Sequence, residues 1–146
     1  MNNLQDLLSK GLLRKDVPDM PKARNSIKTA EHNLDLAKRN FDAEIFESSL
    51  ISSYTCMFHC ARVLLFKDGY KERGHYAVCL YLKEKYSNIL DAKYINELNV
   101  LRTIRHKVIY GDEEEIAIRE VRETEAFSAI KLAEGFLNAV KILIEK

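Results

Sequence analysis

The chain has 146 residues, of which 47% are hydrophobic and 31% charged, with only five glycines. This composition suits one soluble globular domain spanning 1–146 and favours long helices. A net charge of +1 gives no overall electrostatic attraction to nucleic acids or membranes. A local basic face on the surface is still compatible with this charge. The N-terminus MNNLQDLLSK has no signal-peptide pattern, and no run of 18 apolar residues follows, so we expect a cytoplasmic protein without a membrane span.

The chain begins with a short amphipathic stretch that predicts a helix over residues 3–9, followed by a connector over 12–19. Asp19 is expected to cap the next helix, 21–42, which has Pro21 in its first turn. Small apolar residues recur in that helix at steps of three and four, which would let a neighbouring helix approach closely.

A second long helix, predicted over residues 44–67, is apolar nearly all round, which is typical of the central helix of a bundle or of a dimer interface. Thr55, His59 and Arg62 form a polar ridge along it at steps of four and three. His59 is either a core histidine satisfied by a neighbour or part of a cleft.

Three more helices are predicted, over residues 75–86, 91–110 and 116–145, after a polar turn at 71–74. His75 opens the first of them and could contact either the loop backbone or a ligand. No strand alternation or internal repeat is evident. The sequence therefore predicts an all-α fold, an antiparallel helical bundle of three long and two shorter helices plus a short N-terminal helix.

The three cysteines, Cys56, Cys60 and Cys79, lie among apolar neighbours and indicate reduced core thiols in a cytosolic protein. Cys56, His59 and Cys60 have the side chains of metal ligands, but no second Cys or His pair follows at zinc-finger spacing. The two inward-facing Glu-x-x-His motifs on separate helices that a di-metal bundle uses are also absent from the sequence. We therefore expect no metal and no cofactor.

The helix over 91–110 carries an arginine, Arg105, inside its apolar stripe, between Leu101 and Val108. Burying a guanidinium costs several kcal/mol unless it is paired or reaches a polar pocket. Arg105 therefore has a carboxylate partner, lines a cleft, or packs its stem and extends its head to solvent. Tyr110 ends this helix just before a glycine suited to a cap, so Arg105 and Tyr110 could converge on one site.

The same helix ends in a basic cluster containing Arg102, Arg105, His106 and Lys107. The helix dipole favours cations near a C-terminus, so part of this cluster needs no ligand to explain it. An acidic turn at 111–115 follows directly and could pair with the cluster, within the chain or in a partner chain.

Several separated segments resemble one family. The run SSYTCMFHCARVLLFKDGYKERGHYAV (52–78), the opening LLSKGLLRKDVPD and the segment LRTIRHKVIYGD are similar, in order and spacing, to small stand-alone archaeal and bacterial HEPN-domain proteins. The matching positions in the first run are Tyr54, Met57, Phe58, His59, Ala61, Arg62, Leu64, Leu65, Gly69, Tyr70 and His75.

The resemblance implies a helical bundle that commonly forms homodimers. Many HEPN proteins are metal-independent ribonucleases with an R-x4-6-H motif near the dimer interface, whose cleavage leaves a 2′,3′-cyclic phosphate. Others pair with a minimal nucleotidyltransferase in a toxin–antitoxin module. In this chain Arg105 takes the place of the motif arginine, and Tyr110 stands where the motif has histidine.

RNA self-cleavage needs a base for the 2′-hydroxyl, an acid for the leaving oxygen and positive charge at the phosphate. Tyrosine, with a reference pKa of about 10, is a poor base at pH 7, although it can bind a phosphate or stack on a base. His59 or His75 could supply the imidazole instead. The candidate catalytic residues are Arg105 and Tyr110, and the candidate substrate-binding residues are His59, Arg62, His75, Arg102 and His106.

Two functions agree with these observations. The first is a HEPN-like homodimer that binds RNA or a nucleotide in a cleft near the dimer interface, as a metal-independent ribonuclease or as the toxin of a toxin–antitoxin pair. The alternative is a non-catalytic interaction module that recruits a nucleotidyltransferase or another partner.

Overall fold

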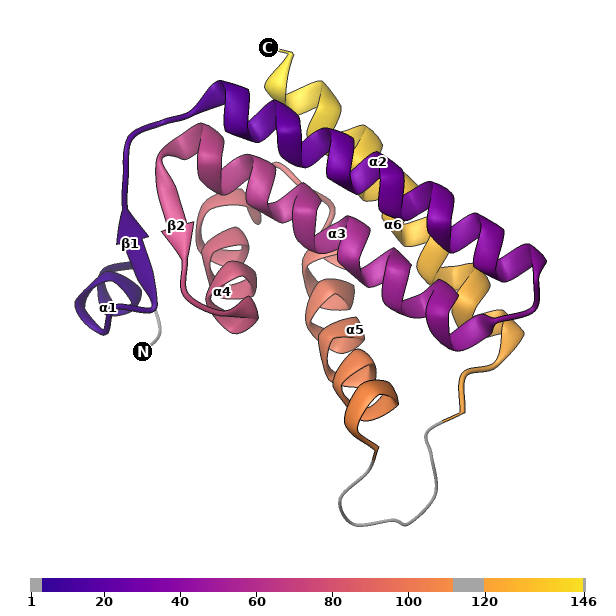
Figure 1. Cartoon of the computed structure of the whole chain (residues 1–146). Coiled ribbons are helices and arrows are strands. Elements are labelled where there is room, and N and C mark those ends of the chain that lie inside the picture. The colour runs from indigo at the N-terminus through magenta and orange to yellow at the C-terminus, as the bar shows by residue number, and fades with distance from the viewer. Residues whose placement is uncertain (1–3, 112–119, 146) are drawn as a thin grey trace.

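The structure is a computed structural model that describes residues 4–111 and 120–145, and Figure 1 shows its elements in chain order. It confirms the all-α bundle, to which a small two-stranded sheet is added. The helices are α1 (Leu4–Ser9), α2 (Met20–Asp42), α3 (Phe46–Asp68), α4 (His75–Tyr86), α5 (Ala92–Tyr110) and α6 (Glu123–Ile144), and the strands are β1 (Leu13–Lys15) and β2 (Tyr70–Glu72).

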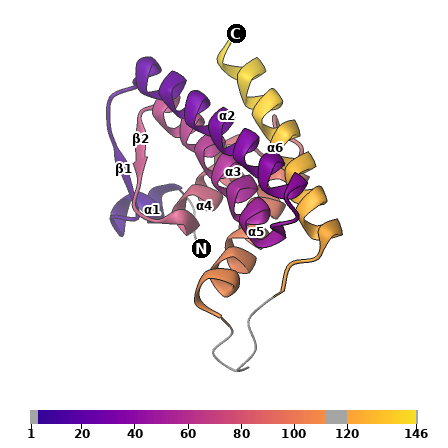
Figure 2. The same ribbon diagram turned by 45° about the vertical axis from the view of Figure 1, so that its right-hand side comes forward.

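The three long helices α2, α3 and α6 run alongside one another, and α4 and α5 cross beneath them, as Figures 1 and 2 show. Helix α3 lies at the centre. Its buried side chains face all directions around its axis, as expected from its apolar pattern. Within the described residues, α3 is also the one helix long and apolar enough to cross a membrane, but 72% of its apolar window is buried in the fold.

Small residues let α2 approach this central helix closely. Ala23, Ala30 and Ala37 are fully buried along α2, and the hydroxyl of Ser49 on α3 donates a 2.8 Å hydrogen bond to the carbonyl of Ala37. The close approach predicted from the small residues of this helix is confirmed. Asp19 also caps α2 as expected, because its carboxylate accepts from the backbone N–H of Lys22 at 3.0 Å.

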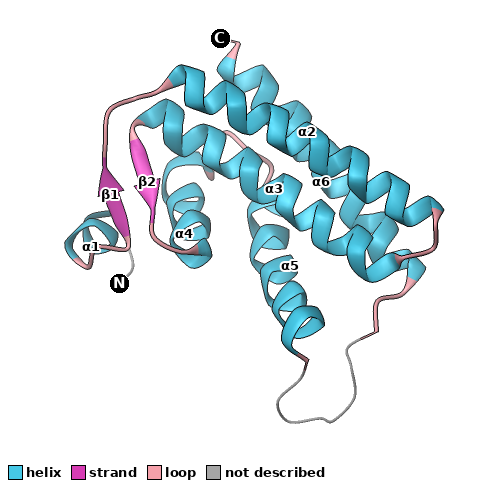
Figure 3. Ribbon diagram, viewed as in Figure 1, coloured by secondary structure: helices cyan, strands magenta, loops and turns pink. Residues whose placement is uncertain are grey.

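The prediction of no strands was wrong, because β1 pairs antiparallel with β2 (Figure 3). Leu13 lies opposite Glu72, and Lys15 lies opposite Tyr70. The expected connector and polar turn each contain part of this sheet. Strands of three residues are too short to show an alternating pattern, so only the packing of the chain reveals them.

The last helix begins later than predicted. Residues 120–122 are non-helical, and α6 starts at Glu123 rather than at 116. The backbone N–H of Arg122 donates to Oε1 of Glu125 at 3.2 Å, which closes a cap before the helix. The acidic turn proposed to pair with the basic cluster falls, apart from Gly111, outside the described residues.

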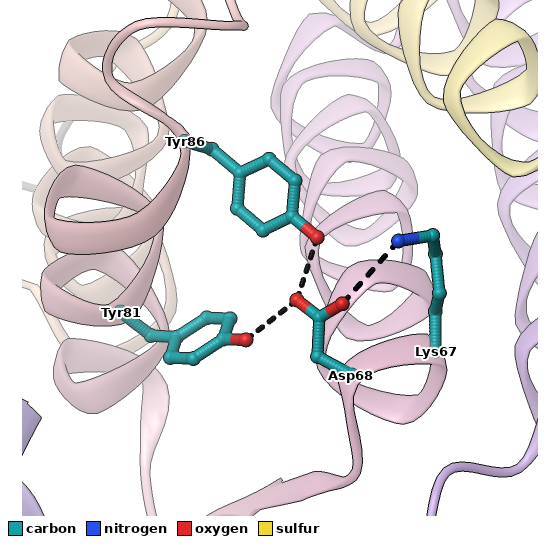
Figure 4. Close-up of polar contacts among 4 residues, drawn as sticks. All are labelled: Lys67, Asp68, Tyr81 and Tyr86. Atoms are coloured by element: carbon teal, nitrogen blue, oxygen red, sulfur yellow. Dashed lines mark hydrogen bonds and ion pairs between the residues drawn. The ribbon is translucent and has the colours of Figure 1, made fainter.

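A carboxylate at the end of α3 holds α4 in place (Figure 4). Oδ2 of Asp68 accepts hydrogen bonds from the hydroxyls of Tyr81 and Tyr86, each at 2.6 Å, and Lys67 Nζ lies 3.4 Å from Oδ1. Burial raises the pKa of both tyrosines, so they remain protonated donors. This network fixes α4 against α3 and thereby fixes where His75, its first residue, lies.

A glycine on α6 allows close contact with α5. A Cβ added to Gly135 would collide with the hydroxyl of Tyr94, and the ring of Tyr94 stacks on Phe136 with centroids 5.5 Å apart and planes within 9°. These contacts set the position of α5, which carries Arg102 and Arg105.

Candidate functional site

The candidate site centres on His75, the first residue of α4. The hydroxyl of Tyr54 lies 2.6 Å from its Nδ1, and the ring of Phe58 stacks on the imidazole with centroids 4.1 Å apart. Both partners come from α3, one helical turn apart. The imidazole is therefore held in one orientation by a hydrogen bond and a stacked ring.

These contacts also define the protonation of His75. Burial raises the pKa of Tyr54, so the phenol keeps its proton, and the one hydrogen bond that its hydroxyl makes within the described residues is to Nδ1. The Tyr54 hydroxyl therefore donates to Nδ1, which places the ring proton on Nε2. Burial, and next the positive charge of Arg105, lower the pKa of His75 and keep the ring neutral near pH 7.

Three arginines surround this imidazole. Arg105 and Arg102 come from α5 and Arg62 from α3, and all three lower the pKa of His75, whereas Glu72 raises it. The Arg105 guanidinium lies over the ring of Tyr54, 5.8 Å from its centroid. Five of the site residues predicted from the sequence therefore lie in one region, although they come from three helices. They are His59, Arg62, His75, Arg102 and Arg105.

The charges of the three arginines are balanced unequally. Nε of Arg62 lies 2.8 Å from Oε1 of Glu72 in β2. Arg102 donates to the neutral side-chain oxygen of Asn99, at 3.1 and 3.3 Å. Arg105 is half-buried and has no carboxylate partner among residues 4–111 and 120–145. The cluster therefore keeps excess positive charge beside a neutral imidazole.

The second imidazole of the cluster, His59, is half-buried on α3. Its Nδ1 is buried and has no hydrogen-bond partner within the described chain, which is uncommon for a buried polar atom. Burial, followed by the charges of Arg62 and His75, lowers the pKa of His59. The expectation of a histidine satisfied by a neighbour is thus not met at Nδ1.

Two predicted site residues lie elsewhere, at the exposed end of α5. Tyr110 is 69% exposed, and its ring lies 4.7 Å from that of His106, centroid to centroid. Five helical positions separate the side chains of Arg105 and Tyr110 by about 140° around the axis. In the described structure Arg105 faces the cluster around His75, and the expected convergence with Tyr110 is not seen.

The sequence matched Tyr54 and Phe58 to the family but did not identify them as site residues that hold His75, and it did not identify Glu72, which pairs with Arg62. Tyr54, Phe58 and Arg62 recur at steps of four on one face of α3, and that spacing could have indicated them. The three cysteines are buried free thiols, as predicted. No group of three metal-ligating side chains is found in the described ranges.

The helical fold and this cluster agree with comparisons to known proteins. The family model for the HEPN domain matches residues 23–143. The chain therefore belongs to the HEPN-domain family, and the resemblance seen in the sequence is confirmed. It is also 28% identical to the archaeal protein named "Putative toxin MJ0605" from Methanocaldococcus jannaschii, over 90% of this chain and 94% of that protein.

Proposed function

We propose that this HEPN-domain protein is a toxin-type ribonuclease that binds an RNA phosphodiester at the cluster around His75 and cleaves it without a metal. The observation that carries the proposal is the neutral imidazole of His75 beside Arg105, whose charge no carboxylate of the described residues offsets. The similarity to a protein named as a toxin supports the same class.

The two arginines of α5 would bind the phosphate. A guanidinium presents its donors in a planar fork that matches two phosphate oxygens. Arg105 is already held over Tyr54 and Arg102 over Tyr76, 5.6 Å from the ring centroid. Because these rings restrict the guanidinium groups before RNA arrives, less side-chain entropy is lost on binding.

His75 would move the protons. In the resting tautomer Nε2–H can donate to a phosphate oxygen. Exchange of the ring proton with solvent, lost from Nε2 and regained at Nδ1, gives the other neutral tautomer. The Tyr54 hydroxyl then rotates and accepts from Nδ1–H, and the Nε2 lone pair is free to take the proton of the 2′-hydroxyl. The 2′-oxygen then bonds to phosphorus, and the bond to the 5′-oxygen breaks. The products are a 2′,3′-cyclic phosphate and a 5′-hydroxyl, and the candidate donor of the proton to the leaving oxygen is the protonated form of His59, which its lowered pKa makes a minor but stronger acid.

A homodimer is part of the proposal, because HEPN-domain proteins commonly dimerise. Support comes from the C-terminal end of α5, where Ile109 and Tyr110 are neighbouring exposed large hydrophobic side chains. Apolar side chains gathered on a surface often mark interaction sites. Tyr110 and His106 would then face the second copy and act on RNA bound there, rather than beside Arg105 of their own chain.

The alternative, a non-catalytic module that recruits a nucleotidyltransferase, is favoured by one observation. The position of the family's motif histidine is occupied by Tyr110, which is exposed and available to a partner. Co-purification of this chain with the product of a neighbouring nucleotidyltransferase gene, together with an absence of RNA cleavage, would favour this alternative.

The test is cleavage of a single-stranded RNA by the purified protein in EDTA. We expect products with cyclic-phosphate ends, which Arg105→Ala and His75→Ala abolish. Arg24→Ala, an exposed arginine on α2, is the matched control and should cleave normally. Equal cleavage by Arg105→Ala and the wild type, or no RNA binding by the wild type, would reject the proposal.

A further inference from the structure

A groove lies between α4 and α5, next to the cluster around His75. Its volume is about 340 Å³, and its lining includes Tyr76 from α4 and Asn96, Asn99 and Val100 from α5. Small-molecule sites have volumes of roughly 300–1,000 Å³. The groove is therefore large enough for one flat ring system but small for a folded peptide.

Arg102 connects this groove to the candidate site. Its guanidinium lies over the ring of Tyr76 and donates to Asn99, and both residues line the groove. The same guanidinium lowers the pKa of His75. A phosphate bound by Arg102 and Arg105 would therefore lie beside the entrance of the groove.

The chemistry of the lining suits a nucleobase. Tyr76 is 48% exposed, and with Arg102 over one face of its ring the other face can accept a stacked base. Among the described lining residues Lys83 carries the one formal charge, and Cys79 is neutral because burial raises the pKa of its thiol to about 11. The side-chain amide of Asn96 has no hydrogen-bond partner in the described residues, and amides can pair with the donors and acceptors of a base edge.

We propose that this groove binds one base of a single-stranded RNA, stacked on Tyr76 and hydrogen-bonded by Asn96 and Asn99. The inference rests on the proposed binding of the adjacent phosphate by Arg102 and Arg105. It specifies a single strand, because the bases of a duplex are stacked and paired with each other and cannot enter the groove.

The test compares two RNA oligonucleotides with the same number of phosphates, one intact and one with an abasic position, by isothermal titration calorimetry. Stacking on an aromatic side chain is worth roughly a 5- to 150-fold difference in Kd per base. The abasic position is moved along the strand in a series of oligonucleotides. When it falls at the nucleotide that enters the groove, we expect the wild type to bind the intact oligonucleotide more tightly by a factor in this range. Tyr76→Ala should lose the preference, and Tyr76→Phe should retain it.

Phe127→Ala is the matched control, because Phe127 is an aromatic residue of α6 that is 50% exposed and lies outside the groove; it should behave as the wild type. Asn96→Ala, at a second exposed position, should also reduce the preference for the intact oligonucleotide.

If the wild type binds intact and abasic RNA equally at every position, or if Tyr76→Ala weakens the binding of both equally, the groove does not bind a base, although phosphate binding stands. If the wild type binds neither oligonucleotide, the proposed function fails as well.

Discussion

Tyr54 and His75 lie 21 positions apart in the chain and join α3 to the first residue of α4 through a 2.6 Å hydrogen bond. Accepting this bond favours the neutral imidazole, because a protonated Nδ1 could not accept it. The tyrosine therefore controls which nitrogen of His75 carries the proton.

Replacing Tyr54 with phenylalanine should raise the pKa of His75, because the neutral ring loses the donor to its Nδ1. The stability of the fold should fall by about 1 kcal/mol, the typical net value of one hydrogen bond. The pKa is measured by NMR titration of the imidazole, with the exposed His32 of α2 in the same spectra as internal control. An unchanged His75 pKa would mean that the Tyr54 hydroxyl does not set its protonation.

Acid should destabilise the protein between about pH 7 and pH 5 through His59 and His75. Both pKa values are lowered in the folded state, so in this window the unfolded chain binds more protons and stability falls as the pH falls. Each histidine can contribute a slope of at most about 1.4 kcal/mol per pH unit. The measurement is urea unfolding at several pH values, and the double variant His59→Gln, His75→Gln should show a flatter profile.

His75→Ala should slow RNA cleavage by about 100-fold or more, the usual effect of losing a general acid or base. Tyr110→Phe should change the rate by less than about threefold if His75 is the base. Single-turnover cleavage rates test both. If His75→Ala is inactive and the double variant His75→Ala, Tyr110→His is active, an imidazole at the end of α5 can act as the catalytic base in place of His75.

RNA binding should depend on salt through the arginines of α5. Each phosphate contact to a single strand contributes about 0.7 to the slope of log Kd against log salt. Arg105→Gln should lower that slope by about this amount, whereas Arg24→Gln should leave it unchanged. Equal slopes for the wild type, Arg105→Gln and Arg24→Gln would show that Arg105 does not contact a phosphate.

Asp68→Ala should destabilise the fold by about 2–3 kcal/mol, because two buried tyrosine hydroxyls lose their acceptor. Adding Tyr81→Phe and Tyr86→Phe in the same chain should recover much of this loss, since both sides of the network are then apolar. Thermal or urea unfolding measures the difference. A triple variant as unstable as Asp68→Ala would show that the carboxylate acts by some means other than these hydroxyls.

Much of this architecture could be predicted from the sequence, because apolar spacing identifies long helices whatever their partners. The same reasoning placed Arg102 and Arg105 together, since residues three apart share a helical face. It could not pair Tyr54 with His75, which depends on how α4 crosses α3. It also missed β1 and β2, because their pairing exists only between two distant segments of the chain.

The family match begins at residue 23, yet the segment before it holds part of the site in place. Strand β1 pairs with β2, and the backbone N–H of Arg73 donates to the carbonyl of Leu12 at 2.9 Å, two residues before His75. The leading segment therefore helps to fix where α4 begins, and with it the position of the His75 imidazole. Leu7 and Leu13 of the same segment are buried in the hydrophobic core, so a substitution there reaches the position of His75 through the sheet and through the core packing at once.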